Sequence, residues 1–155
     1  GDAARPALLL AECVLVYLPP EEGTALIAWA ASKLARGVFV TYEQIGPHDA
    51  FGKTMLRNVA ARGSPLLGLE AFPDCEAQRR RYIQAGWDHA ECESMETLYE
   101  VHLDSRERGR AARLEWLDEV EEWRLIQGHY CMAGRGGGVA ADTGALLYGW
   151  TRWRS

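Results

Sequence analysis

The hydrophobic pattern of the chain opens with an apolar run over residues 7–17, which predicts a buried strand that runs into a loop. One carboxylate, Glu12, interrupts this run, and Tyr17 closes it just before two prolines. A charged side chain in such a setting is unfavourable unless it meets a partner or a ligand. Ligands of open α/β sheets bind at the carboxyl ends of the strands, so we expect Glu12 and Tyr17 to be parts of a site.

The next two patterns complete a strand–helix–strand unit. Proline and acidic residues open a helix over residues 20–35, whose apolar positions recur at helical spacing. Gly37 ends this helix, and a β-rich run over residues 38–42 follows. Two strands joined by a helix predict a right-handed crossover in a parallel sheet.

The chain then alternates between short elements as far as residue 134. The loop over residues 63–73 is apolar, so we expect it to pack against the domain, where it would suit a lid. Beyond the glycine run at 134–138 the pattern has no clean period, which divides the chain into a domain over residues 1–134 and a poorly defined tail over 135–155. Further helices are predicted over residues 48–61, 75–85, 94–100, 104–113 and 117–127, and further strands over 87–93 and 129–133.

A second polar cluster, Tyr42, Glu43 and Gln44, stands at the end of the strand over residues 38–42. The carboxyl ends of parallel neighbours meet at one sheet edge, so this cluster should lie beside Glu12 and Tyr17. Two adjacent strands that both end in polar residues indicate a site more strongly than either does alone. The alternatives are a buried ion pair for Glu12 and a surface aromatic for Tyr17.

Composition narrows the class of protein. The sequence has 155 residues, 48% hydrophobic and 25% charged, which suits one soluble globular domain. The net charge of −5 predicts no strong general attraction to nucleic acid or to an anionic membrane. No apolar stretch reaches the roughly 18 residues of a membrane span, and the first ten residues do not resemble a signal peptide.

The cysteines and basic residues suggest no further chemistry. Four cysteines are widely spaced along the sequence without a C-x-x-C pair, which favours reduced thiols in a cytosolic protein over a disulfide framework or a metal site. The triplet at residues 79–81 points in three directions on a helix, which favours a solvated face over an anion site. The histidines show no metal-ligand spacing, and no nucleophile-elbow motif is present.

One absence bears on the extent of the domain. No glycine-rich strand–turn–helix loop occurs before residue 60, although a doubly wound nucleotide-binding domain normally has one after its first strand. The simplest expectation is that residues 1–155 are the second half of a larger domain.

Several strings of this chain, taken together, strongly resemble the leucine carboxyl methyltransferase family. The resemblance extends over roughly residues 7–133 and rests on the order and spacing of the strings rather than on any one of them. The strings are Ala11–Tyr17, Tyr42–Gln44 with Asp49–Gly52, Arg79–Tyr82, Ala85–Trp87, Leu117–Trp123 and His129–Cys131.

The resemblance implies an α/β fold, the C-terminal half of a class I S-adenosylmethionine-dependent methyltransferase (Rossmann-like) fold, with a mostly parallel sheet and an antiparallel last strand. The chain would supply strands four to seven of that fold, about residues 7–14, 37–42, 87–93 and 129–134. In the family, the glutamate that corresponds to Glu12 contacts the methyl donor, and the tyrosine that corresponds to Tyr17 lies at the active site near the substrate. Tyr42 and Glu43 border the same pocket, and no metal is implied.

Two branches of the family differ in substrate. One methylates the C-terminal leucine carboxylate of the protein phosphatase 2A catalytic subunit, and the other is a paralogue that acts on phenylalanine transfer RNA in wybutosine synthesis. The first and last strings favour the phosphatase branch, whereas Ser64–Leu66 and Phe72–Asp74 resemble the paralogue. The implied protein is a cytoplasmic carboxyl methyltransferase, monomeric when full length, with the phosphatase tail as substrate and transfer RNA as the alternative.

The family also uses upstream residues, including the glycine-rich loop, for which this chain offers no counterpart. We therefore expect the chain alone to bind S-adenosylmethionine weakly or not at all. A non-catalytic truncated product that acts by binding is the second hypothesis.

Overall fold

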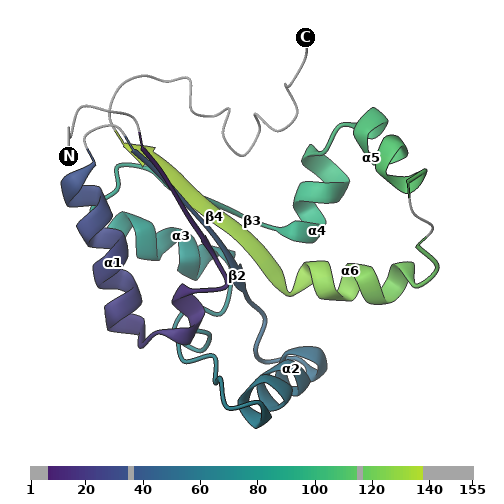
Figure 1. The fold of residues 1–155 in the computed structure, drawn as a ribbon, viewed down its shortest axis with the longest axis horizontal. Coiled ribbons are helices and arrows are strands. Elements are labelled where there is room, and N and C mark those ends of the chain that lie inside the picture. The colour runs from purple at the N-terminus through teal and green to yellow at the C-terminus, as the bar shows by residue number, and fades with distance from the viewer. Residues whose placement is uncertain (1–6, 35–36, 115–116, 138–155) are drawn as a thin grey trace.

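A four-stranded mixed sheet organises the structure, a computed structural model that describes residues 7–34, 37–114 and 117–137 (Figure 1). The strand order is β1-β2-β4-β3; β1 pairs with β2 in parallel, and β4 runs antiparallel to both β2 and β3. Three strands therefore share one direction and the last opposes them, as predicted. The strands are β1 (Ala7–Glu12), β2 (Gly37–Gln44), β3 (Glu91–Ser94) and β4 (Tyr130–Gly137).

The helices begin where the sequence places acids, prolines and caps. Helix α1 (Pro20–Lys33) starts at a proline with two glutamates in its first turn, which suits the positive end of the helix dipole. The Asp49 side chain accepts a hydrogen bond from the Gly52 amide at 2.7 Å and caps α2, and Asp74 caps α3 in the same way. The other elements are η1 (Leu15–Tyr17), α2 (Ala50–Ala61), α3 (Cys75–Gln84), α4 (Met95–Thr97), η2 (Leu98–His102), α5 (Ser105–Ala112) and α6 (Val120–Gly128).

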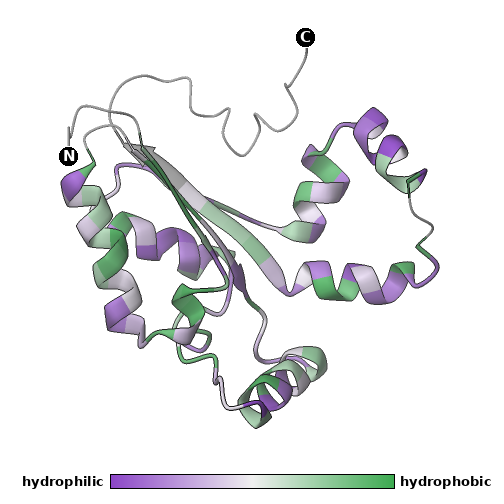
Figure 2. Cartoon of the chain, in the orientation of Figure 1, coloured by the Kyte–Doolittle hydropathy of each residue, from purple (hydrophilic) through white to green (hydrophobic). Residues whose placement is uncertain are grey.

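The main core lies between the sheet and the pair α1 and α3 (Figure 1). Ile27 and Ala30 of α1 and Tyr82 of α3 are fully buried against inward residues of the strands, such as Phe39. By contrast, α5 has no buried residue and is largely hydrophilic along its length (Figure 2). None of the described helices is long and apolar enough to cross a membrane.

The prediction of a buried first strand is wrong for one of its two faces. Leu8 and Leu10 are 67% and 68% exposed, and Glu12 is exposed as well, whereas Ala11 is buried. The physical reason is that α1 and α3 both pack on one face of the sheet, while β1 forms an edge of the described sheet. Side chains that alternate along β1 therefore alternate between core and solvent.

Two other boundaries differ from the prediction. The third strand begins at Glu91 rather than at Trp87, because the Trp87 side chain turns into the core and donates a hydrogen bond from Nε1 to the Ile27 carbonyl at 3.2 Å. The last strand continues past residue 134 to Gly137. Residues 138–155 of the predicted tail lie outside the described residues.

The basic triplet is not a uniformly solvated face. Arg79 and Arg80 are exposed as predicted, but Arg81 is only 2% exposed. Its Nε donates to the Thr24 hydroxyl at 3.1 Å, and its guanidinium lies 4.0 Å from the centre of the Phe72 ring. Arg81 therefore joins α3 to α1 and to the preceding loop.

The apolar loop at 63–73 packs against the domain, which confirms that part of its prediction. Leu66 and Leu69 are buried with Val16 in a second, smaller core cluster. Tyr17 and the inner face of α2 border this cluster. The loop and α2 thus support the segment η1 that follows β1.

Candidate functional site

The carboxyl ends of β1 and β2 bring the predicted site residues together. Glu12 and Tyr42 are directly in register on the two parallel strands, so their side chains emerge on the same face of the sheet. That face is the one opposite to α1 and α3, because Ala11 and Thr41, one residue earlier on each strand, are buried. We call the following group the edge cluster: Glu12, Cys13, Tyr17, Tyr42, Gln44 and Tyr130.

A turn with unusual backbone geometry follows Glu12. Cys13 has φ of 49°, in the left-handed region that residues other than glycine rarely adopt. Its amide donates to the Tyr42 carbonyl at 2.8 Å, which holds the turn against β2. Burial, followed by the charges of Glu43 and Glu12, raises the pKa of the Cys13 thiol to about 11. The thiol is therefore protonated at neutral pH and unsuited to act as a nucleophile.

Glu43 lies on the opposite face of β2 and anchors η1. It is 1% exposed, and its carboxylate accepts hydrogen bonds from the amides of Val14, Leu15 and Val16 at 3.3, 3.0 and 2.8 Å. Burial raises the pKa of Glu43, and the three amide hydrogen bonds and the charge of Arg81 oppose that rise. The predicted pocket residue Glu43 thus fixes the segment that carries Tyr17.

Three tyrosines line the edge cluster. The rings of Tyr42 and Tyr130 stack with centroids 5.1 Å apart, and the Gln44 side-chain amide donates to the Tyr130 hydroxyl at 3.5 Å. Burial, followed by the proximity of Tyr130, raises the pKa of Tyr42 to about 12. The pKa of Tyr130 is also raised, by burial and then by Cys13 and Tyr17, which places Tyr17 near the pair. The phenols of Tyr42 and Tyr130 are protonated at neutral pH and can donate hydrogen bonds.

Two polar groups of the cluster are available to a ligand. The Glu12 carboxylate is exposed, and within the described ranges it has neither a hydrogen-bond nor an ion-pair partner. The Gln44 Oε1 atom is buried, and among the described residues no donor reaches it. A carboxylate and an orphaned carbonyl oxygen fit a cationic ligand that carries N–H or O–H donors, as S-adenosylmethionine does.

An apolar cavity opens on the same face, farther across the sheet. Met132 of β4 is in register with Tyr42, which is in register with Glu12. Adjacent strands lie about 4.8 Å apart, so Met132 is about 10 Å from Glu12. The cavity measures about 220 Å³ and is lined by Met95, Leu98, Tyr99, His102, Leu103, Gln127 and Met132.

A buried histidine, for which the sequence analysis predicted no contact, joins the start of β4 to α2. His129 is 6% exposed, with Nδ1 at 2.7 Å from the Leu125 carbonyl and Nε2 at 2.9 Å from the Asp49 carboxylate. The Gly52 amide and His129 lower the pKa of Asp49. Eighty residues separate His129 from Asp49, so no local spacing pointed to this contact. It positions α2 beside the edge cluster.

Comparison with known proteins supports the resemblance found in the sequence. The chain is 53% identical to human "tRNA wybutosine-synthesizing protein 4" over 129 residues, which cover 83% of the chain and 19% of that protein. It is 41% identical to "Leucine carboxyl methyltransferase 1 homolog" of Arabidopsis thaliana over 131 residues, 84% of the chain and 40% of that protein. It is 38% identical to "Leucine carboxyl methyltransferase 1" of Schizosaccharomyces pombe, over 84% of the chain and 42% of that protein. The chain thus spans less than half the length of each of these relatives.

The fold comparison agrees with the sheet topology. Phosphoethanolamine N-methyltransferase 2 of Haemonchus contortus, solved with S-adenosylhomocysteine, matches with a TM-score of 0.50 over 85% of the chain and 33% of that protein. At 13% identity this likeness concerns the fold alone, which is the class I methyltransferase fold. No protein-family model matches the chain.

Proposed function

We propose, from the homology of this chain to leucine carboxyl methyltransferases and their wybutosine-synthesising relatives, that it forms the C-terminal part of an S-adenosylmethionine-dependent carboxyl methyltransferase. The observation that carries the proposal is the row Glu12–Tyr42–Met132. In this row a carboxylate that has no partner among the described residues, a protonated phenol and an apolar cavity share one face of the sheet. Because the chain covers less than half of its relatives, the activity is proposed for the complete protein.

The reaction requires little proton chemistry from the protein. The bound cofactor supplies an activated methyl group on a sulfonium, and a substrate carboxylate is already ionised at pH 7. The protein therefore has to align the two reactants and exclude water. Catalysis by a general base is not required.

Four residues of the edge cluster have a proposed part in that alignment. Glu12 would hold the cationic methyl donor, and the Gln44 carbonyl oxygen would accept one of its donors. The phenols of Tyr17 and Tyr42 would donate hydrogen bonds to the substrate carboxylate. Glu43 acts through the backbone: its carboxylate holds η1 and so fixes the position of Tyr17. The four free cysteines suit a cytoplasmic location.

Two substrates remain, each supported by a separate observation. The 53% identity to human tRNA wybutosine-synthesizing protein 4, against 38–41% to the leucine carboxyl methyltransferases cited above, favours a modified guanosine of transfer RNA. This identity supports transfer RNA as the substrate, whereas the first and last sequence strings favoured the phosphatase tail. The apolar lining of the cavity over Met132 favours the phosphatase tail, because such a cavity suits a leucine side chain.

A labelled-methyl assay of the complete protein tests both parts of the proposal. Methyl transfer is measured to a peptide with the C-terminal leucine of the phosphatase and to phenylalanine transfer RNA that carries the modified guanosine. We expect Glu12→Gln, which removes the charge and keeps the size, to lower kcat/KM about 10- to 100-fold, as expected for a lost charged hydrogen bond. The exposed Glu22 of α1 provides the control variant Glu22→Gln, with unchanged turnover. Equal activity of both variants would remove Glu12 from the site, and transfer to neither substrate would refute the proposed function.

A further inference from the structure

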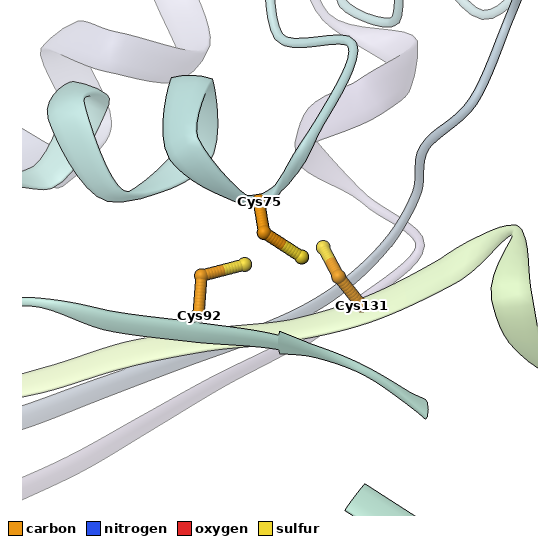
Figure 3. Close-up of side chains that lie close together, drawn as sticks. All are labelled: Cys75, Cys92 and Cys131. Carbon is orange, nitrogen blue, oxygen red and sulfur yellow. The ribbon is translucent and has the colours of Figure 1, made fainter. Parts of the chain in front are cut away.

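Three cysteine sulfurs converge between α3 and the sheet (Figure 3). Cys75 is the first residue of α3, Cys92 lies in β3 and Cys131 lies in β4. Their Sγ atoms all lie within 4.8 Å of one another. The wide spacing of these cysteines in the sequence gave no sign of this convergence, because residues that come from three separate elements leave no short spacing.

The sheet register explains why the two strand cysteines meet. Cys92 is in register with Ala133, and Cys131 is in register with Ser94, so the two cysteines are diagonal neighbours on one face of the β3–β4 pair. That face is the covered one, since Ala133 and Cys131 are fully buried. The first turn of α3 places Cys75 over them, with all three side chains directed inward (Figure 3).

The surroundings favour a thiolate at this point. Cys75 follows the cap residue Asp74, so it lies at the helix N-terminus, where the backbone dipoles stabilise negative charge. Hydrogen bonds from the thiols of Cys131 and Cys92 lower the pKa of Cys75 to about 4. The same interactions raise the pKa of Cys92 and of Cys131. The helix N-terminus and the two neighbouring thiols thus both favour negative charge on the Cys75 sulfur.

We propose that Cys75, Cys92 and Cys131 bind a thiophilic divalent cation, Zn²⁺, through three thiolates. Zinc–sulfur bonds of about 2.3 Å place the sulfurs of such a site about 3.8–4.0 Å apart, which small side-chain rotations reach from the present spacing. Three protein ligands leave one coordination position for water or another small ligand. On binding, Zn²⁺ enters and the remaining thiol protons of the three cysteines leave to solvent, with no oxidation or reduction.

The site is separate from the proposed methyl-transfer face. Cys131 is in register with Glu43, whose side chain points away from Tyr42 and Glu12. A bound Zn²⁺ would join α3 to β3 and β4, and so stabilise the covered side of the sheet. The inference does not depend on the proposed function.

Metal titration of the reduced, metal-free 155-residue chain tests the site. Cd²⁺, which reports thiolate binding through ultraviolet charge-transfer absorbance, should bind in one equivalent, and Zn²⁺ should displace it. Cys13 lies outside the group and provides the matched control, so Cys13→Ser should titrate like the original chain. Cys75→Ser, at a half-buried position, should lower the affinity at least tenfold. Circular dichroism of each variant shows whether it is folded.

A second measurement keeps the inference testable if Cys75→Ser fails to fold. Zn²⁺ should protect three of the four thiols of the unmodified chain from alkylation, leaving Cys13 as the labelled residue in a mass spectrum. It should also raise the Tm, because the unfolded chain lacks the assembled ligands. The inference is wrong if all four thiols are alkylated with Zn²⁺ present, if Cys13→Ser and Cys75→Ser lose affinity equally, or if two of the cysteines form a disulfide that Zn²⁺ does not prevent.

Discussion

Replacing Glu43 by alanine should destabilise the protein more than replacing any exposed carboxylate. The carboxylate of Glu43 is the partner of three backbone amides at the start of η1. Two of these amides belong to Leu15 and Val16, which are 0% and 3% exposed, so water cannot replace the lost acceptor. The variant therefore leaves two buried donors unsatisfied.

The magnitude follows from those two donors. A buried donor without a partner is unfavourable by about 1–3 kcal/mol, so Glu43→Ala should lower the free energy of unfolding by about 2–6 kcal/mol. A domain of this size is stable by only about 5–15 kcal/mol, so the loss is a large part of the total. Glu43→Gln keeps one acceptor oxygen and should lower the free energy of unfolding by about half as much.

Urea unfolding followed by circular dichroism measures the change. The exposed Glu22 of α1 provides the control, because Glu22→Ala removes a carboxylate without a buried partner and should stay within about 0.5 kcal/mol. The assignment of Glu43 to η1 is refuted if Glu43→Ala and Glu22→Ala unfold at the same urea concentration with the same slope.

Two further predictions concern the surroundings of Arg81 and of Tyr42. Gly23→Ala should lower the Tm of the protein, because the added Cβ would overlap the buried Arg81 guanidinium. Ala25→Ser, on the exposed side of α1, is the control and should leave the Tm nearly unchanged. The pKa of Tyr42 is raised to about 12 in the folded protein. The protonated phenol of Tyr42 therefore contributes fully to the free energy of unfolding below about pH 10, and this contribution is lost as the pH rises through 12. The free energy of unfolding, measured with urea between pH 8 and about pH 11, should fall less with rising pH in Tyr42→Phe than in the original protein. The same fall in the variant and in the original protein would contradict this prediction.

Local signals predicted the elements that depend on neighbours in the chain. The proline start of α1 and the aspartate caps of α2 and α3 are confirmed, as are the direction of the last strand and the family resemblance. The helix starts can be predicted from a few adjacent residues, and the resemblance can be recognised from several sequence strings in a fixed order. The roles of Glu12, Tyr17, Tyr42 and Glu43 stay predictions.

Features that depend on long-range packing were not accessible from the sequence. The exposure of Leu8 and the burial of Arg81 depend on which face α1 and α3 cover, and no local period shows that. Trp87 matched a strand by composition but its indole is drawn into the core by the Ile27 carbonyl. The cysteine group and the His129–Asp49 contact join segments far apart in the chain, so their spacing carries no signal.

The exposed edge of β1 has a practical consequence for work with the isolated chain. Among the described strands β1 has a neighbour on one side only, and the leucines of its outer face, Leu8 and Leu10, are about two-thirds exposed. An apolar strand with a free hydrogen-bonding edge is a template for strand addition by another molecule. We expect the isolated chain to self-associate as its concentration rises. Replacing Leu8 and Leu10 by lysine should suppress that association. Binding measurements on the isolated chain should therefore be made at low protein concentration.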